Sequence, residues 1–300
     1  MAISIFQKSI IYFLRLLRIY SVYFPINKGK EIIIFVQRRL ILNLKSLVAV
    51  SIDNRKFHLK IPEDMERTSI FSAGYCEKDL TLLFQRIIRK DDILFDLGAN
   101  IGWYTTLFGR DGGQCHAFEP NPQVFSRLIY NCEINEIRKN KLYLNNLAVG
   151  DKESVVSFYS FRNLHHGLSS LSDFRRDDKI EIKVEKTTLT EYVFKKDIKH
   201  IDIIKVDVEG AELEVLKGSQ ELLSSGYSPI WVFEMNEETS NAFNYKPSDI
   251  LMFLKDYGYS FYVIEKKIRL MKSIYDYFHG SNVLCINPDI HSDKIEKIYE

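Results

Sequence analysis

The 300-residue sequence is poor in cysteine and carries almost no net charge. Its four cysteines, Cys76, Cys115, Cys132 and Cys285, include no C-x-x-C pair, which argues against a zinc ribbon and against a disulfide framework. Forty-one basic and 40 acidic residues leave a formal charge of +1, so no overall field attracts nucleic acid. We therefore expect a protein of a reducing, cytoplasmic compartment that does not bind nucleic acid.

The N-terminal region lacks the long uncharged run that a membrane-spanning helix needs, roughly 18 to 20 residues. Residues 1–30 carry five basic and no acidic residues among apolar ones. On a helix, Lys8, Arg15 and Arg18 would share one sector and leave a broad apolar surface. We favour an amphipathic helix packed on its own domain, and peripheral contact with the inner face of a membrane stays open as the alternative.

Two strand-like stretches follow this helix. Residues 47–52 are mostly apolar, residues 56–61 alternate polar with apolar positions, and Asp53 and Asn54 between them supply turn chemistry. We predict a β-hairpin here, so that residues 1–64 form an extension of one helix and one hairpin.

From about residue 86, short apolar strands alternate with helical stretches, which predicts a parallel sheet covered on both faces. The rhythm breaks at about residues 150–188, where two strand-like stretches flank a polar loop containing His165 and His166. Insertions at strand ends commonly shape substrate pockets. We predict an α/β domain over residues 65–290 that contains this insertion, followed by a tail over residues 291–300.

The most informative motif is DLGANIG, residues 96–102, where an apolar strand turns into a helix. Gly98 and Gly102 let the backbone turn tightly and approach a ligand, and the amides of the following helix can receive a carboxylate. Glu119 ends the next strand, 23 residues after Asp96 (119 − 96). From that position a carboxylate binds the ribose diol in nucleotide-binding α/β folds. These residues predict an adenosine-bearing cofactor.

The charge of the motif indicates which cofactor this is. Asn100 replaces the middle glycine of G-x-G-x-x-G, and no arginine or lysine lies between Asp96 and Phe108 to meet a pyrophosphate. S-adenosylmethionine has no phosphate and carries an ammonium and a sulfonium, which favour the carboxylates Asp96, Glu119 and Asp207. We therefore predict S-adenosyl-L-methionine.

These motifs resemble those of the FkbM-type methyltransferases, a branch of the class I Rossmann-like methyltransferases. The matching stretches are FDLGANIGWYT (95–105), AFEPNP (117–122), NLAVG (146–150), IKVDVEGAELEVLKG (204–218) and FEMN (233–236). The resemblance implies a seven-stranded, mostly parallel sheet in the order 3-2-1-4-5-7-6 whose last strand is antiparallel. It also implies that residues near Asn146 and Ala148 flank the adenine. The predicted cofactor site comprises Asp96, Gly98, Asn100, Gly102, Glu119, Pro120, Asn146, Ala148 and Asp207.

Carboxylates also end two later strands. Asp207 and Glu209 follow the strand at about residues 201–206, and ligands bind at such strand ends, so we expect them to orient or deprotonate an acceptor hydroxyl. Glu234 ends the neighbouring strand and is predicted to hydrogen-bond the acceptor. Asp207, Glu234 and Asn236 offer oxygen ligands for Mg²⁺ as an alternative. We favour a site without metal, because the resemblance brings none.

His166, in the polar insertion, is a further candidate for accepting the acceptor's proton, although a loop histidine is usually only solvated. The resemblance implies O-methylation of a sugar, glycolipid or secondary metabolite, and we expect a small-molecule or glycan acceptor in polysaccharide biosynthesis. Two alternatives stay open. One is an NAD(P)-dependent sugar oxidoreductase, for which basic phosphate partners and a Y-x-x-x-K motif are missing; the other is a non-catalytic Rossmann-like binding module.

Overall fold

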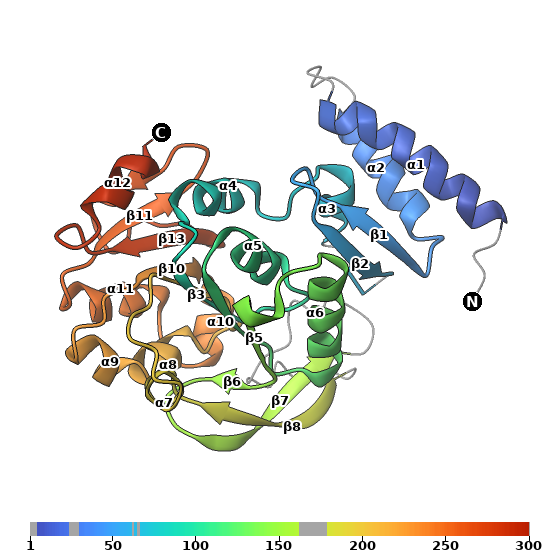
Figure 1. Ribbon diagram of the computed structural model, residues 1–300. Helices are drawn as coiled ribbons and strands as arrows, with labels where there is room; N and C mark the ends of the chain where they lie inside the picture. The colour runs from blue at the N-terminus through green and yellow to red at the C-terminus, as the bar shows by residue number, and fades with distance from the viewer. Residues whose placement is uncertain (1–4, 24–29, 62, 65–66, 162–178, 300) are drawn as a thin grey trace.

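The computed structural model describes residues 5–23, 30–61, 63–64, 67–161 and 179–299, and an eight-stranded sheet forms their centre (Figure 1). Across the sheet the strands are β12 (Arg269–Leu270), β11 (Ser260–Ile264), β13 (Ser281–Ile286), β10 (Ile230–Met235), β9 (Ile203–Val206), β3 (Ile93–Leu97), β4 (Gln114–Phe118) and β5 (Leu142–Asn145). Neighbours from β5 to β10 pair in parallel, and β13 is antiparallel to both β10 and β11.

Without β12, these strands numbered in chain order give the sequence 3-2-1-4-5-7-6 across the sheet. The predicted number of strands was one too few, because β12 has only two residues and is too short to produce an alternating pattern. It pairs antiparallel with β11 at the edge of the sheet. The fold is thus a mostly parallel, Rossmann-like α/β fold.

Helices cover both faces of the sheet, each over its own apolar cluster. One face carries α4 (Lys78–Ile87), α5 (Trp103–Asp111), α6 (Pro122–Ile134) and α12 (Ser292–Ile298), and the other carries α7 (Leu189–Lys195), α8 (Glu212–Lys217), α9 (Gln220–Ser224), α10 (Glu237–Ala242) and α11 (Pro247–Lys255). A short 3₁₀ helix, η1 (Lys139–Lys141), precedes β5. Because both faces are covered, all four residues of β9 are buried, which explains why the central strands read as continuous apolar runs.

Two of these helices show how local sequence sets their positions. Helix α6 opens with Pro122 at its first turn, and the side chain of Asn121 accepts hydrogen bonds from the amides of Gln123 and Val124. Helix α12 occupies most of the predicted tail. Its Lys294 Nζ lies 2.7 Å from Asp92 Oδ2, and both side chains are buried, so this segment packs on the sheet domain.

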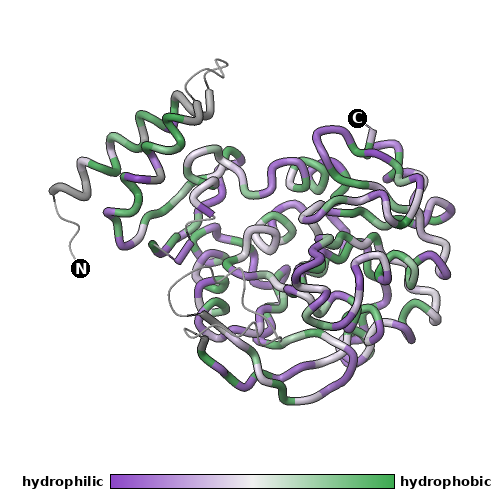
Figure 2. Tube along the Cα trace, turned by 180° about the vertical axis from the view of Figure 1, so that it is seen from behind, coloured by the Kyte–Doolittle hydropathy of each residue, from purple (hydrophilic) through white to green (hydrophobic). Residues whose placement is uncertain are grey.

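The N-terminal extension contains two helices and a hairpin: α1 (Ile5–Tyr23), α2 (Lys30–Ile41), β1 (Ser46–Val50) and β2 (Lys56–Lys60). The hairpin confirms its prediction: β1 and β2 pair antiparallel, and Asn54 takes φ 67° in the turn. Helix α2 was not predicted. Its run IIIFV consists of β-branched and aromatic residues, which locally favour a strand. The segment is nevertheless helical because it packs against α1. Both helices project from the main body, and much of their length is apolar (Figure 2). No helix of the described ranges is long and apolar enough to cross a membrane.

The insertion forms a second small sheet from β6 (Ala148–Val149), β7 (Ser154–Phe161) and β8 (Lys179–Thr187), in the order β6-β8-β7. Strands β7 and β8 pair antiparallel, which confirms the predicted hairpin. The polar loop between them, with His165 and His166, lies outside the described residues. The sheet brings part of β7 close to the carboxyl ends of the central strands, where the candidate site lies.

Candidate active site

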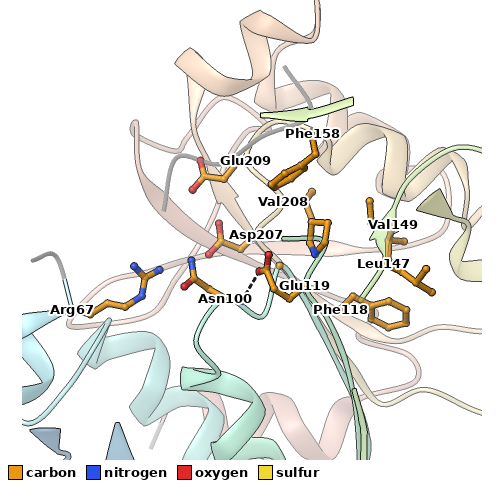
Figure 3. A pocket seen from close by; sticks show the side chains of 13 residues that line it. Arg67, Asn100, Phe118, Glu119, Leu147, Val149, Phe158, Asp207, Val208 and Glu209 are labelled. Atoms are coloured by element: carbon orange, nitrogen blue, oxygen red, sulfur yellow. Dashed lines mark hydrogen bonds between the residues drawn. The ribbon is translucent and has the colours of Figure 1, made fainter. Parts of the chain in front are cut away.

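A cavity enclosing about 620 Å³ of empty space, part of it open to solvent, lies where β3, β4 and β9 end (Figure 3). Ligand pockets commonly have volumes of several hundred Å³ and lie at this edge of open α/β sheets. Its lining residues are Arg67, Gly98, Asn100, Phe118, Glu119, Pro120, Leu147, Ala148, Val149, Phe158, Asp207, Val208 and Glu209. Six of the nine predicted cofactor residues are thus in the lining: Gly98, Asn100, Glu119, Pro120, Ala148 and Asp207.

The turn after β3 forms the floor of the cavity. Gly98 has φ 80°, and a Cβ there would lie 1.8 Å from the carbonyl oxygen of Asp207, so only glycine lets the ends of β3 and β9 approach this closely. Gly102, with φ 92°, begins α5 and does not line the cavity. Asn100 has φ 49°, an uncommon conformation for a residue with a side chain. This conformation directs its backbone N–H at the carboxylate of Glu119.

The Glu119 carboxylate is fixed by two backbone amides. Its Oε2 accepts a hydrogen bond from Asn100 N at 2.9 Å, and its Oε1 accepts one from Asn121 N at 2.8 Å. Each oxygen keeps a second acceptor direction, so the carboxylate can also accept from a pair of ribose hydroxyls. Burial, only partly offset by the two amides, raises the pKa of Glu119 to about 7.

Asn146, predicted to flank the adenine, does not line the cavity. Its Nδ2 donates to the carbonyl oxygens of Glu119 at 2.8 Å and of Pro120 at 2.9 Å. The side chain therefore holds the loop after β4 that presents Glu119 to the cavity.

Asp96 is buried behind the turn, at 1% exposure, and does not reach the lining. Its Oδ2 accepts from Thr105 Oγ1 at 2.6 Å, whereas its Oδ1 is buried with no hydrogen-bond partner in the part of the chain that the structure describes. Burial raises the pKa of Asp96 to about 6. A buried acceptor without a partner is costly, so this oxygen suits the ammonium of an amino-acid-bearing ligand, directly or through water.

Lys205, which motif reasoning overlooked, lies among these carboxylates. It is 3% exposed, it is the register partner of Asp96 on the neighbouring strand, and its Nζ donates to Asp207 Oδ2 at 2.5 Å. Burial lowers the pKa of Lys205, but the carboxylates of Asp207, Glu77 and Asp96 outweigh it and raise the pKa overall. The signal in the sequence was a single lysine inside the otherwise apolar strand IIKV.

Two further carboxyl groups lie close to Asp207. Glu209 lines the cavity with φ 51°, and burial together with the charges of Asp207 and Glu234 raises its pKa. Glu234, at the end of β10, is not in the lining. Burial and the charge of Asp207 raise its pKa as well. Negative charges close to a buried carboxyl group oppose its ionisation, so Glu209 and Glu234 both lose their protons less readily than ordinary glutamates.

The groups proposed as magnesium ligands have other partners. The Oδ1 of Asn236 caps α10 by accepting from the amides of Glu238 at 3.1 Å and Thr239 at 3.2 Å. Asp207 is bound by the ammonium of Lys205. Two of the three oxygen-bearing side chains are thus engaged with other groups of the protein.

Residues 96–261, more than half of the chain, match the family described as the methyltransferase FkbM domain. This chain belongs to the FkbM methyltransferase family.

Several curated relatives resemble the chain over part of its length. It is 28% identical over 149 residues to the hexuronic acid methyltransferase AglP of Haloferax volcanii, which covers 50% of this chain and 59% of that protein. It is 26% identical over 181 residues to the 2-O-methyltransferase NoeI of Sinorhizobium fredii, covering 53% and 72%. It is 27% identical over 164 residues to the 31-O-demethyl-FK506 methyltransferase FkbM of Streptomyces tacrolimicus, covering 45% and 62%. The chain spans about six tenths of the length of the first relatives it matches.

Two lining residues lie outside the FkbM motifs. Arg67 precedes α3 (Thr68–Ser72) and reaches the cavity near Asn100, where it is the only cation among the lining residues that the structure describes (Figure 3). Phe158 comes from β7 of the insertion and contributes to the apolar part of the wall with Leu147 and Val149. Neither residue belongs to a recognisable motif, and hydrophobic patterning gives no sign that β7 faces this site.

Proposed function

We propose that this protein transfers a methyl group from S-adenosylmethionine to a hydroxyl group of a sugar-containing or other small-molecule acceptor. The observation that carries the proposal is the distribution of charge along the cavity. Glu119 lies at the end of β4, where it would bind the ribose. Asp207 and Glu209 lie across the cavity in the loop that follows β9. The family, together with relatives named for hexuronic acid, 2-O and FK506 methylation, supports this reaction class.

Each part of the cofactor has a matching group in or beside the cavity. Glu119 would bind the ribose hydroxyls, and Ala148, Leu147 and Phe158 provide apolar contacts for the adenine. Oδ1 of Asp96 suits the ammonium of the methionine part, and Arg67 suits its carboxylate. When bound, the cofactor supplies an electrophilic methyl group on a sulfonium.

The acceptor side requires alignment and one proton acceptor. In-line methyl transfer depends mainly on holding the nucleophile in position. Because Lys205 already binds Asp207, we assign Asp207 the orienting role, and we assign proton removal to the carboxyl pair of Glu209 and Glu234. His166 keeps its predicted role as an alternative base in the insertion.

The rival oxidoreductase finds little support in the cavity. A dinucleotide brings an anionic pyrophosphate, whereas the charged lining consists of Glu119, Asp207, Glu209 and a single cation, Arg67. We also propose a cytoplasmic location, in keeping with the four free cysteines, three of which are buried.

The proposal is tested first by calorimetry of the full chain with S-adenosylhomocysteine and with NADP⁺. We expect the former to bind and the latter not to, and the reverse result would replace the proposal with the oxidoreductase. The chain is then incubated with methyl-labelled cofactor and fractionated cell extract. Label in glycan or glycolipid is the expected outcome. Cofactor binding without transfer to any fraction would favour the non-catalytic module.

A further inference from the structure

The outward face of α1 is apolar and has no cover from the described residues. The helix packs against α2 and α3, and its exposed side chains lie on the side opposite to its buried ones. The buried residues are Ile10 and Leu14, and the exposed ones are Tyr12, Phe13, Leu16 and Ile19. Four large apolar residues on one helix face are more than the scattered exposure expected of a surface helix.

Helix α2 repeats this arrangement. Gln37 and Ile41 are fully buried, whereas Ile32 and Phe35 are 68% and 69% exposed, and Arg39, about one turn beyond Phe35, is exposed as well. Helices α1 and α2 pack side by side (Figure 1), and both contact α3, so we infer that their exposed apolar residues form one surface over the two helices. We call Tyr12, Phe13, Leu16, Ile19, Ile32 and Phe35 the helical apolar surface.

Charge is distributed very unevenly between this extension and the rest of the chain. Residues 1–45 contain eight of the 41 basic residues but only one of the 40 acidic residues, a formal charge of +7. The remaining residues carry −6, so the net charge of +1 conceals a strongly basic segment. Such a segment is attracted to anionic surfaces, while the rest of the protein is repelled by them.

The extension is attached firmly to the catalytic part. The guanidinium of Arg18 on α1 donates to the carbonyl of Val50 on β1 and lies 5.9 Å from the ring centroid of Phe71 on α3. Helix α3 begins directly after Arg67, which lines the cavity. A surface that holds the extension therefore also holds the cavity in a fixed orientation.

We propose that the helical apolar surface binds an anionic lipid bilayer, with α1 and α2 lying in the interface rather than crossing it. Apolar side chains next to a basic segment are what interfacial helices use, and none of the described helices is suited to span a membrane. A second copy of the chain is a poorer occupant, because it would bring two segments of charge +7 together. This inference goes beyond the proposed function and requires no catalysis.

The test is flotation of the full chain with vesicles of phosphatidylcholine alone and of phosphatidylcholine mixed with phosphatidylglycerol. We expect binding to the anionic vesicles that weakens with added salt. The double variant Phe13→Gln/Phe35→Gln should lower partitioning by roughly tenfold or more, since two aromatic rings no longer insert. Arg39→Glu should lower it by at least about fivefold on anionic vesicles.

The matched control is Phe194→Gln/Met252→Gln, which removes two large apolar residues exposed on α7 and α11. It should bind vesicles like the wild type. Calorimetry with S-adenosylhomocysteine shows that each variant keeps its fold and separates this inference from failure of the proposed function. The proposal is overturned if the wild type does not bind anionic vesicles, or if Phe13→Gln/Phe35→Gln binds as well as the control. A concentration-dependent dimer lost in Phe13→Gln/Phe35→Gln, without vesicle binding, would identify a second copy as the occupant instead.

Discussion

The ammonium of Lys205 lies 2.5 Å from Oδ2 of Asp207, at the point where β9 enters the cavity. Both residues belong to one strand end, two positions apart, so they share a face of the sheet. Lys205 is the cation that compensates a group of carboxylates including Asp96, Glu77 and Asp207. The charge balance of the site thus depends on one buried lysine.

Replacing this lysine should alter the pH dependence of the reaction. In Lys205→Met the charge of Asp207 is no longer compensated, so the pKa of the Glu209 and Glu234 pair rises further. We expect kcat at neutral pH to fall roughly tenfold or more and the pH–rate curve to move to higher pH. Lys205→Arg keeps the positive charge, so its pH–rate curve should lie close to that of the wild type. Lys183→Met, which removes an exposed partner of Glu181, is the control. A lowered kcat with an unmoved pH–rate curve would mean that Lys205 is only structural.

The proton-accepting role of Glu209 and Glu234 predicts the direction in which kcat changes with pH. Burial raises the pKa of Glu234, and a base acts only when deprotonated, so kcat should increase with pH through a value above that of an ordinary carboxyl group. In Glu234→Gln one negative neighbour of Glu209 is gone, so Glu209 should titrate at lower pH. Glu209→Gln tests the partner in the same way. If neither variant changes the pH–rate curve, proton removal belongs to another group, and His166→Ala becomes the next variant to examine.

A change at Arg67 should weaken binding of the amino-acid part of the cofactor and leave binding of its nucleoside part unchanged. Arg67→Gln removes the one cation found among the described residues of the cavity lining, and we expect roughly tenfold weaker binding of S-adenosylhomocysteine. Binding of 5′-methylthioadenosine, which lacks the carboxylate, should not change. Calorimetry with the two ligands measures both values, and Arg269→Gln, in an exposed ion pair with Asp276, is the control. Equal losses for both ligands would contradict the assignment.

Gly98 should be intolerant of any side chain. In Gly98→Ala a Cβ would meet the Asp207 carbonyl at 1.8 Å in addition to the strain of φ 80°, so we expect a loss of several kcal/mol in the free energy of unfolding. Gly226→Ala provides the comparison, because Gly226 has φ 91° and open space around it. That variant should lose only about 1 kcal/mol. Denaturant unfolding measures both, and similar losses would show that the close approach is unimportant.

The sequence by itself determined the repeating strands and helices, the turn at residues 96–102 and the placement of Glu119 after β4. Short stretches of sequence determine these features, because strand burial, glycine conformation and helix capping each depend on a few neighbouring residues. The order of the seven longer strands came from the resemblance, and the observed sheet has the same order.

Only the tertiary structure decided which distant residues meet. Arg67 comes from a segment before the motifs and Phe158 from the insertion between two of them, and they reach one cavity because α3 and β7 pack beside the sheet. The same holds for α2, whose β-branched sequence favours a strand until α1 provides an apolar partner. Asn146 also has another role than the predicted one, since its side-chain amide donates to carbonyl oxygens of the loop after β4, which only the folded chain brings close. Contacts between remote segments depend on packing of the whole chain, and no local pattern encodes them.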